Sequence, residues 1–276
     1  MEEALTSLPS NERDAYESII AQIKRSGISS MKRAFQALSW VFHAKRPLQM
    51  EELREALLVK EESDLDDSFK RGLLASDIVE LCQSLIVHEK SSDIVRFTHA
   101  TVQDWLLKSK SFEDLPSSVY LAKSCLVYLG LEFFIKPCHD ETSLKELLRQ
   151  YKFCRYAAQF WGFHSKGEAE RCVAVQKAIL ALLESENKRN AILEMEANAN
   201  LARGYISFTT GQTLLHVIAG NGLAGICRLV LDRQPHRPGN ERYVFSVSMK
   251  VDSKSPRGSA NSGPRGQRLG LGGAGR

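Results

Sequence analysis

The stretch at residues 94–106 changes from a strand pattern to a helix pattern within a few positions. Its first part, 94–99, alternates with the period of two that is typical of a half-buried strand. The alternation predicts Val95, Phe97 and His99 on one face, so we expect the His99 side chain to point the same way as the buried pair.

A helix is expected to begin directly after this strand. Thr101 with Asp104 three residues later is typical of a helix N-terminus. Val102, Trp105 and Leu106 then follow the i, i+3, i+4 spacing of an apolar helix face. A strand and a helix therefore both fix the position of His99.

Residues 28–112 contain the order helix, helix, helix, hairpin, which is that of a winged helix domain. A polar four-residue connector, Lys90-Ser91-Ser92-Asp93, separates two β-prone runs and predicts the hairpin. Helices are expected at 31–44, 50–59 and 78–82, strands at 85–89 and 94–99, and a charge-dense loop at 60–69.

A lead-in helix is predicted within residues 1–27. It spans about 11–24, where Ala15, Ile19 and Ile23 are spaced by four. Tyr16 and Ile20 lie beside that stripe.

Residues 113–205 read as a helical linker block, a bundle or solenoid-like arrangement of about five helical segments. In the first helix Val119, Ala122, Leu126, Leu129 and Phe133 point inward, and Pro137 ends it. Ser143 and Glu146 form a capping box for the next. An apolar face then runs to Gly162, and one more long helix carries Cys172, Val175, Ile179, Leu182 and Leu183.

Residues 206–233 and residues 234–276 differ sharply from each other in pattern and composition. Residues 206–233 read as a turn, a short helix, a glycine-containing turn and a second short helix. Residues 234–276 hold eight of the 18 glycines and four of the eight prolines, together with eight Lys or Arg against two Asp or Glu. Such a composition predicts a disordered basic tail.

Charge and cysteine usage predict a soluble cytoplasmic protein. The net charge of +4 comes from the tail, because residues 1–233 carry 29 basic and 31 acidic side chains. Six cysteines without any Cys-x-x-Cys are typical of reduced, mostly buried thiols. The longest apolar run, 125–135, is too short to span a bilayer, so no membrane contact is expected.

No catalytic site, metal site or cofactor site is predicted within the chain. It lacks the Gly-x-x-x-x-Gly-Lys-Ser/Thr and Gly-x-Gly-x-x-Gly loops that hold phosphates. Cys138-His139, Cys154 and His164 match no compact zinc spacing, so structural roles are expected for them. We therefore expect a protein that is not an enzyme.

Winged helices often read DNA with their third helix. Here that helix, 76–83, carries Asp77 and Glu80 and no Lys or Arg. Carboxylates facing phosphates repel them, so DNA is not an expected partner.

Several motifs in a fixed order resemble one family. They are Leu5-x-x-Leu8-Pro9 with Tyr16 and Ile20, Ala37-Leu38-x-Trp40 with Arg46-Pro47-Leu48, Phe97-x-His99-Ala100-Thr101-Val102-x-Asp104-x-Leu106, and Tyr156-x-x-x-Phe160-Trp161-Gly162-x-His164. Together they resemble the region that follows the NACHT nucleotide-binding domain in fungal NACHT-ankyrin proteins, which are STAND-type relatives of NOD-like receptors.

The segment 211–222 resembles a single ankyrin repeat. Its motif residues are Gly211, Thr213, Leu215, His216, Ala219 and Gly222, while Leu214 stands in place of the usual proline and Ile218 in place of an alanine. From the residues alone, His216 is expected to hydrogen-bond neighbouring backbone. One repeat is fewer than the three or so that a stable stack needs, and the change after Asp232 is typical of a truncated or mispredicted gene product.

The resemblance implies a role for His99. In NACHT-type switches a winged helix histidine contacts the phosphates of bound ADP and holds the closed state, which exchange for ATP releases. The family therefore implies a NACHT domain acting in cis or in trans, and protein partners for the ankyrin part. Three hypotheses stay open: this regulatory role, a free-standing interaction scaffold in which His99 is only structural, and DNA binding. For His99 itself, the alternative to a phosphate contact is a core position in which its neighbours satisfy it.

Overall fold

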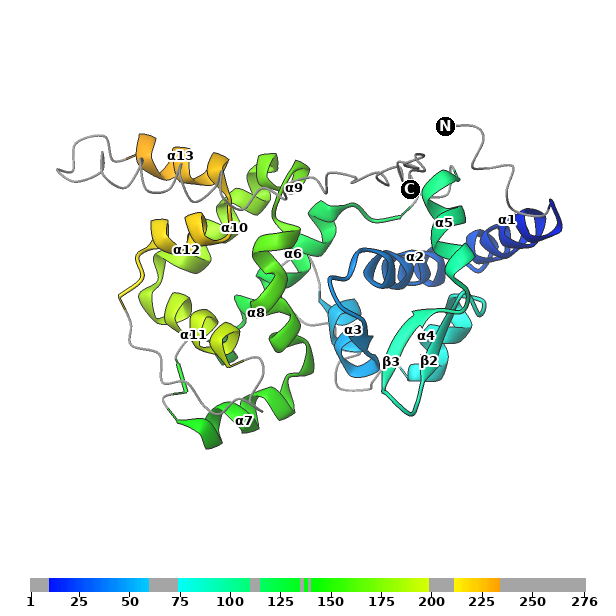
Figure 1. Cartoon of the computed structure of the whole chain (residues 1–276), viewed down its shortest axis with the longest axis horizontal. Coiled ribbons are helices and arrows are strands. Elements are labelled where there is room, and N and C mark those ends of the chain that lie inside the picture. Colours follow the sequence, from blue (N-terminus) through cyan, green and yellow to red (C-terminus); the bar gives the residue numbers. More distant parts are fainter. Residues whose placement is uncertain are drawn as a thin grey trace, which may run out of the picture.

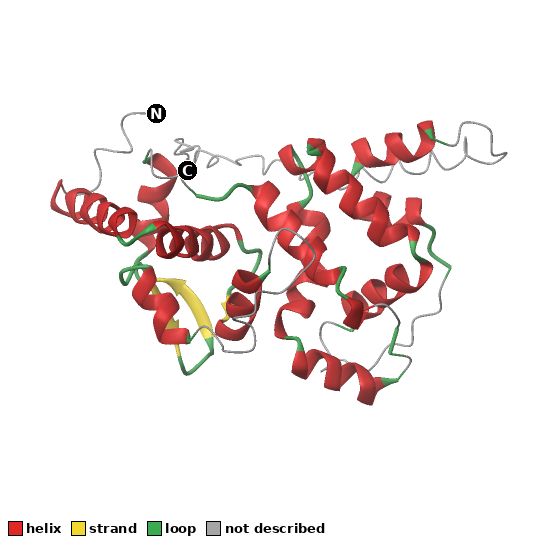
Figure 2. Ribbon diagram, turned by 180° about the vertical axis from the view of Figure 1, so that it is seen from behind, coloured by secondary structure: helices red, strands yellow, loops and turns green. Residues whose placement is uncertain are grey.

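The computed structural model describes residues 10–59, 74–109, 115–134, 137–138, 140–198 and 211–233. Over these ranges the chain is mainly helical and has one small antiparallel sheet (Figures 1 and 2), which confirms the predicted fold class. The predicted loop 60–69 and the predicted tail 234–276 lie outside the described residues. No helix within the described ranges is both long and apolar enough to cross a bilayer.

The elements fall into two parts that lie side by side along the long axis of the molecule (Figure 1). The first part contains α1 Ser10–Arg25, α2 Ile28–His43, β1 Leu48–Gln49, α3 Met50–Leu58, α4 Ala75–Leu81, β2 Ile86–Glu89, β3 Ile94–Phe97 and α5 Ala100–Lys108. The second contains α6 Ser118–Leu129, η3 Glu132–Phe134, α7 Glu141–Gln150, α8 Lys152–His164, α9 Glu168–Arg171, α10 Val173–Glu184, α11 Glu186–Ala197, α12 Leu214–Gly220 and α13 Ala224–Asp232.

The sheet has the strand order β1-β3-β2. Strands β2 and β3 form the predicted hairpin, in which Ile86 pairs with Phe97. Strand β1 is a finding that the sequence does not predict, and it adds Leu48 opposite Val95 on the other side of β3. Because β1 has two residues, it shows no alternation that periodicity can detect.

Helix α2 is buried on two sides, as its pattern predicts. Leu38 and Trp40 are both fully buried, and the buried part of the helix continues from Ala34 to Trp40. This helix lies between α1 and the sheet on one side and the second part of the chain on the other (Figure 1).

Helix α1 packs through four of the five residues that the pattern predicts, with Ile19 partly buried against the core. Tyr16, Ile20 and Ile23 are buried, whereas Ala15 is exposed. The Tyr16 ring lies 5.5 Å from that of Trp105. The larger side chains therefore set which face of α1 turns inward, because they bury more apolar area.

One predicted helix end in the second part is wrong. Helix α6 ends at Leu129, before a turn at Gly130, rather than at Pro137. After this turn Phe133, which is predicted to point inward, is 56% exposed, whereas Phe134 is buried. Helix α8 carries the predicted apolar face up to Gly162 and ends at His164.

The N-terminus of α7 is also earlier than predicted. Asp140, not Ser143, occupies the N-cap position, and its carboxylate accepts a hydrogen bond from the Ser143 amide at 2.8 Å. A carboxylate here satisfies a free amide and is attracted by the helix dipole. Ser143 instead donates its hydroxyl to the same carboxylate at 2.6 Å.

The long helix expected around residues 172–183 is confirmed as α10, which begins directly after its N-cap residue Cys172. A short helix that the pattern does not predict, α9, precedes it. Helix α11, at Glu186–Ala197, is missing from the prediction because it is buried almost all round from Asn190 to Met195 and so lacks a one-sided apolar stripe.

Candidate functional site

The joint between β3 and α5 presents His99 differently from the prediction. Strand β3 ends at Phe97, and His99 is the N-cap residue of α5 with an extended backbone (φ −133°, ψ 146°). Its side chain is exposed. The expected burial beside Val95 and Phe97 is wrong because the strand alternation stops two residues earlier, and a satisfied core histidine is excluded with it.

Thr101, the predicted N-cap residue of α5, contacts another helix instead of capping its own. Thr101 lies inside the first turn of α5, and its hydroxyl is 2.9 Å from that of Tyr16. This contact joins α5 to α1. The helix begins at Ala100, one residue before the predicted cap.

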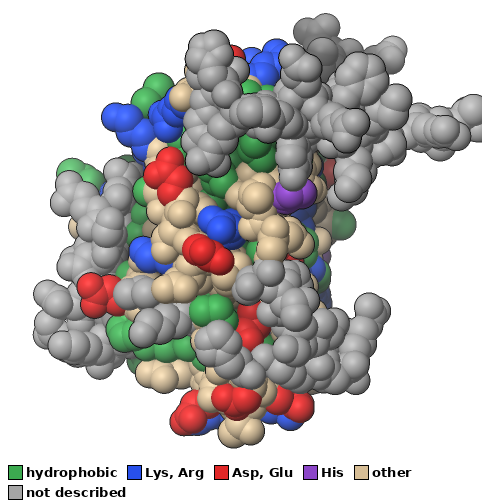
Figure 3. Space-filling view, turned by 90° about the vertical axis from the view of Figure 1, so that its left-hand side faces the viewer, with side chains coloured by type: hydrophobic (Ala, Val, Ile, Leu, Met, Phe, Trp, Pro, Cys, Tyr) green, Lys and Arg blue, Asp and Glu red, His purple; other side chains and the backbone are tan. Residues whose placement is uncertain are grey.

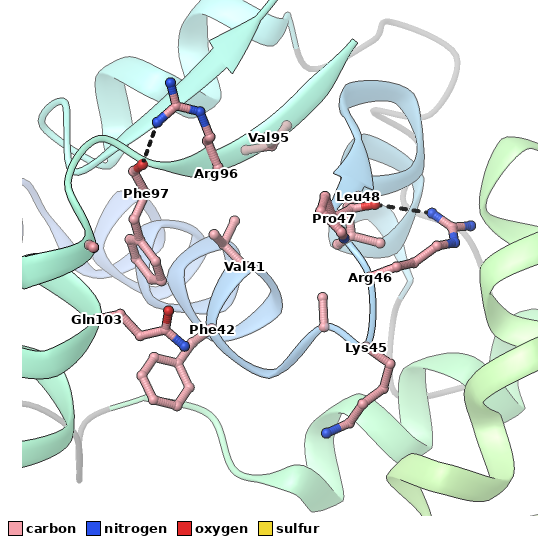
Figure 4. A pocket seen from close by; sticks show the side chains of 12 residues that line it. Val41, Phe42, Lys45, Arg46, Pro47, Leu48, Val95, Arg96, Phe97 and Gln103 are labelled. Carbon is pink, nitrogen blue, oxygen red and sulfur yellow. Dashed lines mark hydrogen bonds between the residues drawn. The ribbon is translucent and has the colours of Figure 1, made fainter. Parts of the chain in front are cut away.

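A cleft of about 450 Å³ opens beside this joint (Figure 4). It lies between the C-terminal end of α2, the start of β1, the edge of β3 and the first turn of α5. Its walls combine apolar and basic side chains and no carboxylate among the described lining residues. These residues are Val41, Phe42, Ala44, Lys45, Arg46, Pro47, Leu48, Val95, Arg96, Phe97, Ala100 and Gln103.

The three cations of the cleft differ in how they are held. Arg46 forms a two-pronged ion pair with Glu52, with both N–O distances 2.6 Å, and Glu52 is 2% exposed. Lys45 lies 3.7 Å from the centre of the Phe163 ring, and desolvation lowers its pKa. Arg96 is exposed, so Lys45 and Arg96 set the charge of the rim.

Helix α4 carries the third-helix position that reads DNA in many proteins of this fold. Asp77 and Glu80 are its charged residues, and Asp77 also caps its N-terminus by accepting from the Leu74 amide at 3.2 Å. The helix has no basic side chain with which to approach phosphates.

The first part of the chain matches a known family. Residues 21–118 match the family model described as GPI inositol-deacylase, winged helix domain. These residues form a winged helix domain. The match includes α2, the three strands, α3, α4 and α5. No curated protein and no solved structure matches the chain.

The winged helix domain joins the second part of the chain through a buried carboxylate. Glu55, on α3, accepts hydrogen bonds from the amides of Lys152 and Phe153, both at 3.0 Å, at the start of α8. It also accepts the Tyr128 hydroxyl from α6. Burial and the Glu55 charge raise the pKa of Tyr128 well above its ordinary value, so this phenol stays a donor.

An aromatic cluster surrounds Trp40 at the same junction. The Trp40 ring lies edge-on to Phe153 at 5.2 Å and to Tyr156 at 5.8 Å. The Tyr156 hydroxyl accepts from the Lys45 amide at 3.0 Å and lies 2.9 Å from His164 Nε2.

Burial keeps His164 neutral. Desolvation, followed by the charges of Lys45 and His43, lowers its pKa from 6.5 to about 4. The sequence predicts a structural role for His164. The structure places it at the centre of the junction between the winged helix domain and α8.

Helices α12 and α13 and the turns beside them carry the residues of the predicted ankyrin motif. Thr213 occupies the N-cap of α12, and its amide donates to His216 Nδ1 at 3.2 Å. This confirms the expected backbone bond of His216. Gly222 has a φ of +73° in the turn between the helices, a region that favours glycine.

The other motif residues frame this helix pair. Gly211 is exposed, while Leu215 and Ala219 are half-buried on α12. Residues 206–210 lie outside the described part. On the end of the molecule that Figure 3 shows, the coloured basic, acidic and apolar side chains intermingle.

The helix pair docks closely on the block of α8 to α10. A Cβ added at Gly162 would lie 1.9 Å from Asn221 Oδ1, so only glycine allows this approach. Glu170 of α9 accepts from the amides of Gly225 at 2.6 Å and Ile226 at 3.3 Å, at the start of α13. The sequence gives no signal for these contacts, since each joins distant segments.

The cysteines are free thiols, four of them buried, as their spacing predicts. Cys154 lies against Met195, with the sulfurs 3.5 Å apart, while the Cys138 amide donates to Glu194. Among the described residues no three His, Cys, Asp or Glu side chains converge as metal ligands do. His139 lies outside the described residues.

Proposed function

We propose that this chain is a non-catalytic, cytoplasmic regulatory segment of a NACHT-ankyrin signalling protein. Its winged helix domain would gate a nucleotide switch that a NACHT domain supplies in cis or in trans. The helices α12 and α13 would begin a protein-binding ankyrin surface. The observation that carries the proposal is the exposed His99 at the start of α5, beside a cleft with a basic rim.

The connection between β3 and α5 suits an anionic ligand presented by another domain. His99 stands at the N-terminus of a nine-residue helix that has no acidic residue in its first turn. Helix N-termini attract phosphates because their amides are unpaired and their dipoles are positive. Arg96 and Lys45 add positive charge along the cleft. No cofactor is assigned to this chain alone, and ADP or ATP would belong to the NACHT domain.

The junction supports a gating role because it links the winged helix domain to the helical block. Glu55 and the cluster around Trp40 bury polar and aromatic groups between α3, α6 and α8. Closely packed interfaces move as units rather than bending gradually. A displacement of the winged helix on nucleotide exchange would therefore carry the helical block with it.

The acidic α4 supports a protein or nucleotide role over DNA reading. Loss of binding as salt rises is the usual sign of phosphate contacts. A salt-dependent shift of duplex DNA by this chain would favour DNA binding instead.

The test uses a protein in which a NACHT domain precedes this chain. The change His99→Leu removes the imidazole donor, and we expect ADP release to become about tenfold faster, as loss of one charge-assisted hydrogen bond implies. Bound nucleotide is measured by chromatography after purification, and release by displacement of a fluorescent ADP analogue.

His88→Leu is the matched control, because His88 belongs to the same domain but bonds Asp93 on the hairpin at 2.8 Å. The control should retain ADP. Unchanged ADP release and basal signalling in His99→Leu would contradict the gating role and leave the scaffold hypothesis.

A further inference from the structure

Strand β3 has an open edge where it borders the cleft. Strand β1 pairs with β3 only through Leu48 opposite Val95 and Gln49 opposite Ile94. Before Leu48 the chain turns away at Pro47, so within the described residues β1 does not continue opposite Phe97.

The hydrogen-bond pattern shows which residues face this edge. The Thr98 amide donates to the Leu85 carbonyl at 3.0 Å, toward β2. Backbone groups alternate in direction along an antiparallel strand. Those of Arg96 therefore also face β2, while those of Val95 and Phe97 face β1 and, beyond its end, the cleft.

Arg96 covers the carbonyl at this edge. Its guanidinium donates to the Phe97 oxygen at 3.3 Å, as the dashed line in Figure 4 shows. A side chain here takes the place that the amide of a neighbouring strand would occupy. An incoming strand amide can replace it, which frees Arg96 to bind a carboxylate of the incoming chain.

The remaining walls suit a side chain flanked by acidic groups. Phe42 and Phe97 form an apolar surface, and Gln103 projects between them with an amide that can donate and accept (Figure 4). The charges of Lys45 and Arg96 flank that surface. The volume of about 450 Å³ lies within the usual range of binding sites.

We propose that this cleft binds an extended acidic peptide from a protein partner, which adds a short strand to the open edge of β3 beyond β1. The backbone of the peptide would bond Phe97, an apolar side chain would enter between Phe42 and Phe97, and carboxylates on either side would meet Arg96 and Lys45. Strand addition of this kind takes affinity from the main chain and specificity from pockets and charge. The peptide would use the same Arg96 and Lys45 that form the basic rim beside His99, but its binding requires neither His99 nor a NACHT domain.

The probe is a fluorescein-labelled nine-residue peptide of alternating Glu and Val with Phe at its centre. A peptide with Lys in place of every Glu is its control. We expect saturable binding of the acidic peptide to the full chain by anisotropy and at least about tenfold weaker binding of the basic one, because opposite charges select the partner. Hydrogen exchange should show new protection of the Phe97 amide.

Two charge reversals test the site, and a third is their control. Arg96→Glu and Lys45→Glu should each weaken the acidic peptide about tenfold and raise affinity for the basic one. Lys32→Glu, an exposed position on α2 outside the cleft lining, should leave binding unchanged. Circular dichroism checks that each variant keeps the fold.

Three results would overturn the proposal. The first is no binding of the acidic peptide up to about 1 mM, a concentration that corresponds to only about 4 kcal/mol of affinity. The second is equal binding of the acidic and the basic peptide. The third is unchanged binding of the acidic peptide in both charge-reversed variants. Displacement of the bound peptide by ADP would assign the cleft to a nucleotide instead.

Discussion

The helical block meets the winged helix domain and the α12–α13 pair through the same kind of contact. In each junction a glutamate of one unit accepts hydrogen bonds from the first amides of a helix in the next. Glu55 bonds the start of α8, and Glu170 bonds the start of α13. The surroundings of the two carboxylates differ.

Glu55 is 7% exposed and shares its pocket with the Tyr128 hydroxyl and the rings around Trp40. Glu170 is half-buried, and the approach beside it depends on a glycine, Gly162, rather than on aromatic packing. Hydrogen bonds strengthen as water is excluded, and the loss of one partner then leaves the others unsatisfied. The first junction should therefore be the harder one to open.

The largest expected effect is that of Glu55→Ala. The change leaves the Tyr128 hydroxyl and two amides without their acceptor in a buried site. We expect the free energy of unfolding to fall by about 4 kcal/mol. Urea denaturation followed by tryptophan fluorescence measures it.

Glu170→Ala is the matched change at the other junction. A half-exposed helix cap contributes about 1 kcal/mol, and the amides of Gly225 and Ile226 can turn to water. Equal losses for the two variants would show that burial does not distinguish the junctions.

The second effect is a dependence of the free energy of unfolding on pH, and it arises at the first junction. The folded pKa of His164 is about 4, below its ordinary value of 6.5. Between these values the unfolded chain binds a proton that the folded chain excludes, so stability falls as pH decreases from about 6.5 to 4. The total loss is about 3 kcal/mol.

His164→Gln keeps a side chain that can hydrogen-bond the Tyr156 hydroxyl, but the amide does not bind a proton in this pH range. Its unfolding free energy should change less over the same pH range, with a remaining slope from His43, whose pKa burial also lowers. Parallel pH profiles for the variant and the natural chain would exclude His164 as the cause.

The third effect is local to the second junction. In Gly162→Ala the new Cβ would lie 1.9 Å from Asn221 Oδ1 and 2.7 Å from its Cβ, so the whole Asn221 side chain must move. Overpacking of this kind costs about 2 kcal/mol. Hydrogen exchange should become faster in α12 and α13 and stay unchanged in α2.

Gly220→Ala is the control, since a Cβ at Gly220 meets nothing within 4 Å. Adding Asn221→Gly to Gly162→Ala should restore slow exchange, because it removes the atoms in conflict. Failure of this rescue would mean that the contact does not hold the pair in place.

Periodicity in the sequence was sufficient to predict α2, the hairpin and the helix pair α12–α13, because each has a repeating apolar pattern or a turn motif. It failed for β1 and α11, where two residues or burial all round leave no pattern. His99 shows most clearly what periodicity cannot predict. Its motif is visible in the sequence, but the direction of its side chain depends on the residue at which β3 ends.

The junction residues were not predictable for another reason. Glu55 belongs to the charged sequence Glu51-Glu52-Leu53-Arg54-Glu55, which resembles a solvated helix face. Its burial depends on α8, about 100 positions later in the chain. Single-sequence patterns describe local structure and carry no information about such distant partners.

The buried face of Trp40 also affects how this protein can be divided. The matched domain ends at residue 118, but Phe153 and Tyr156, which cover Trp40, belong to α8. An excised domain would expose that aromatic surface to solvent and tend to aggregate. In recombination during evolution, as in protein engineering, a segment that is transferred with this surface covered must include α8.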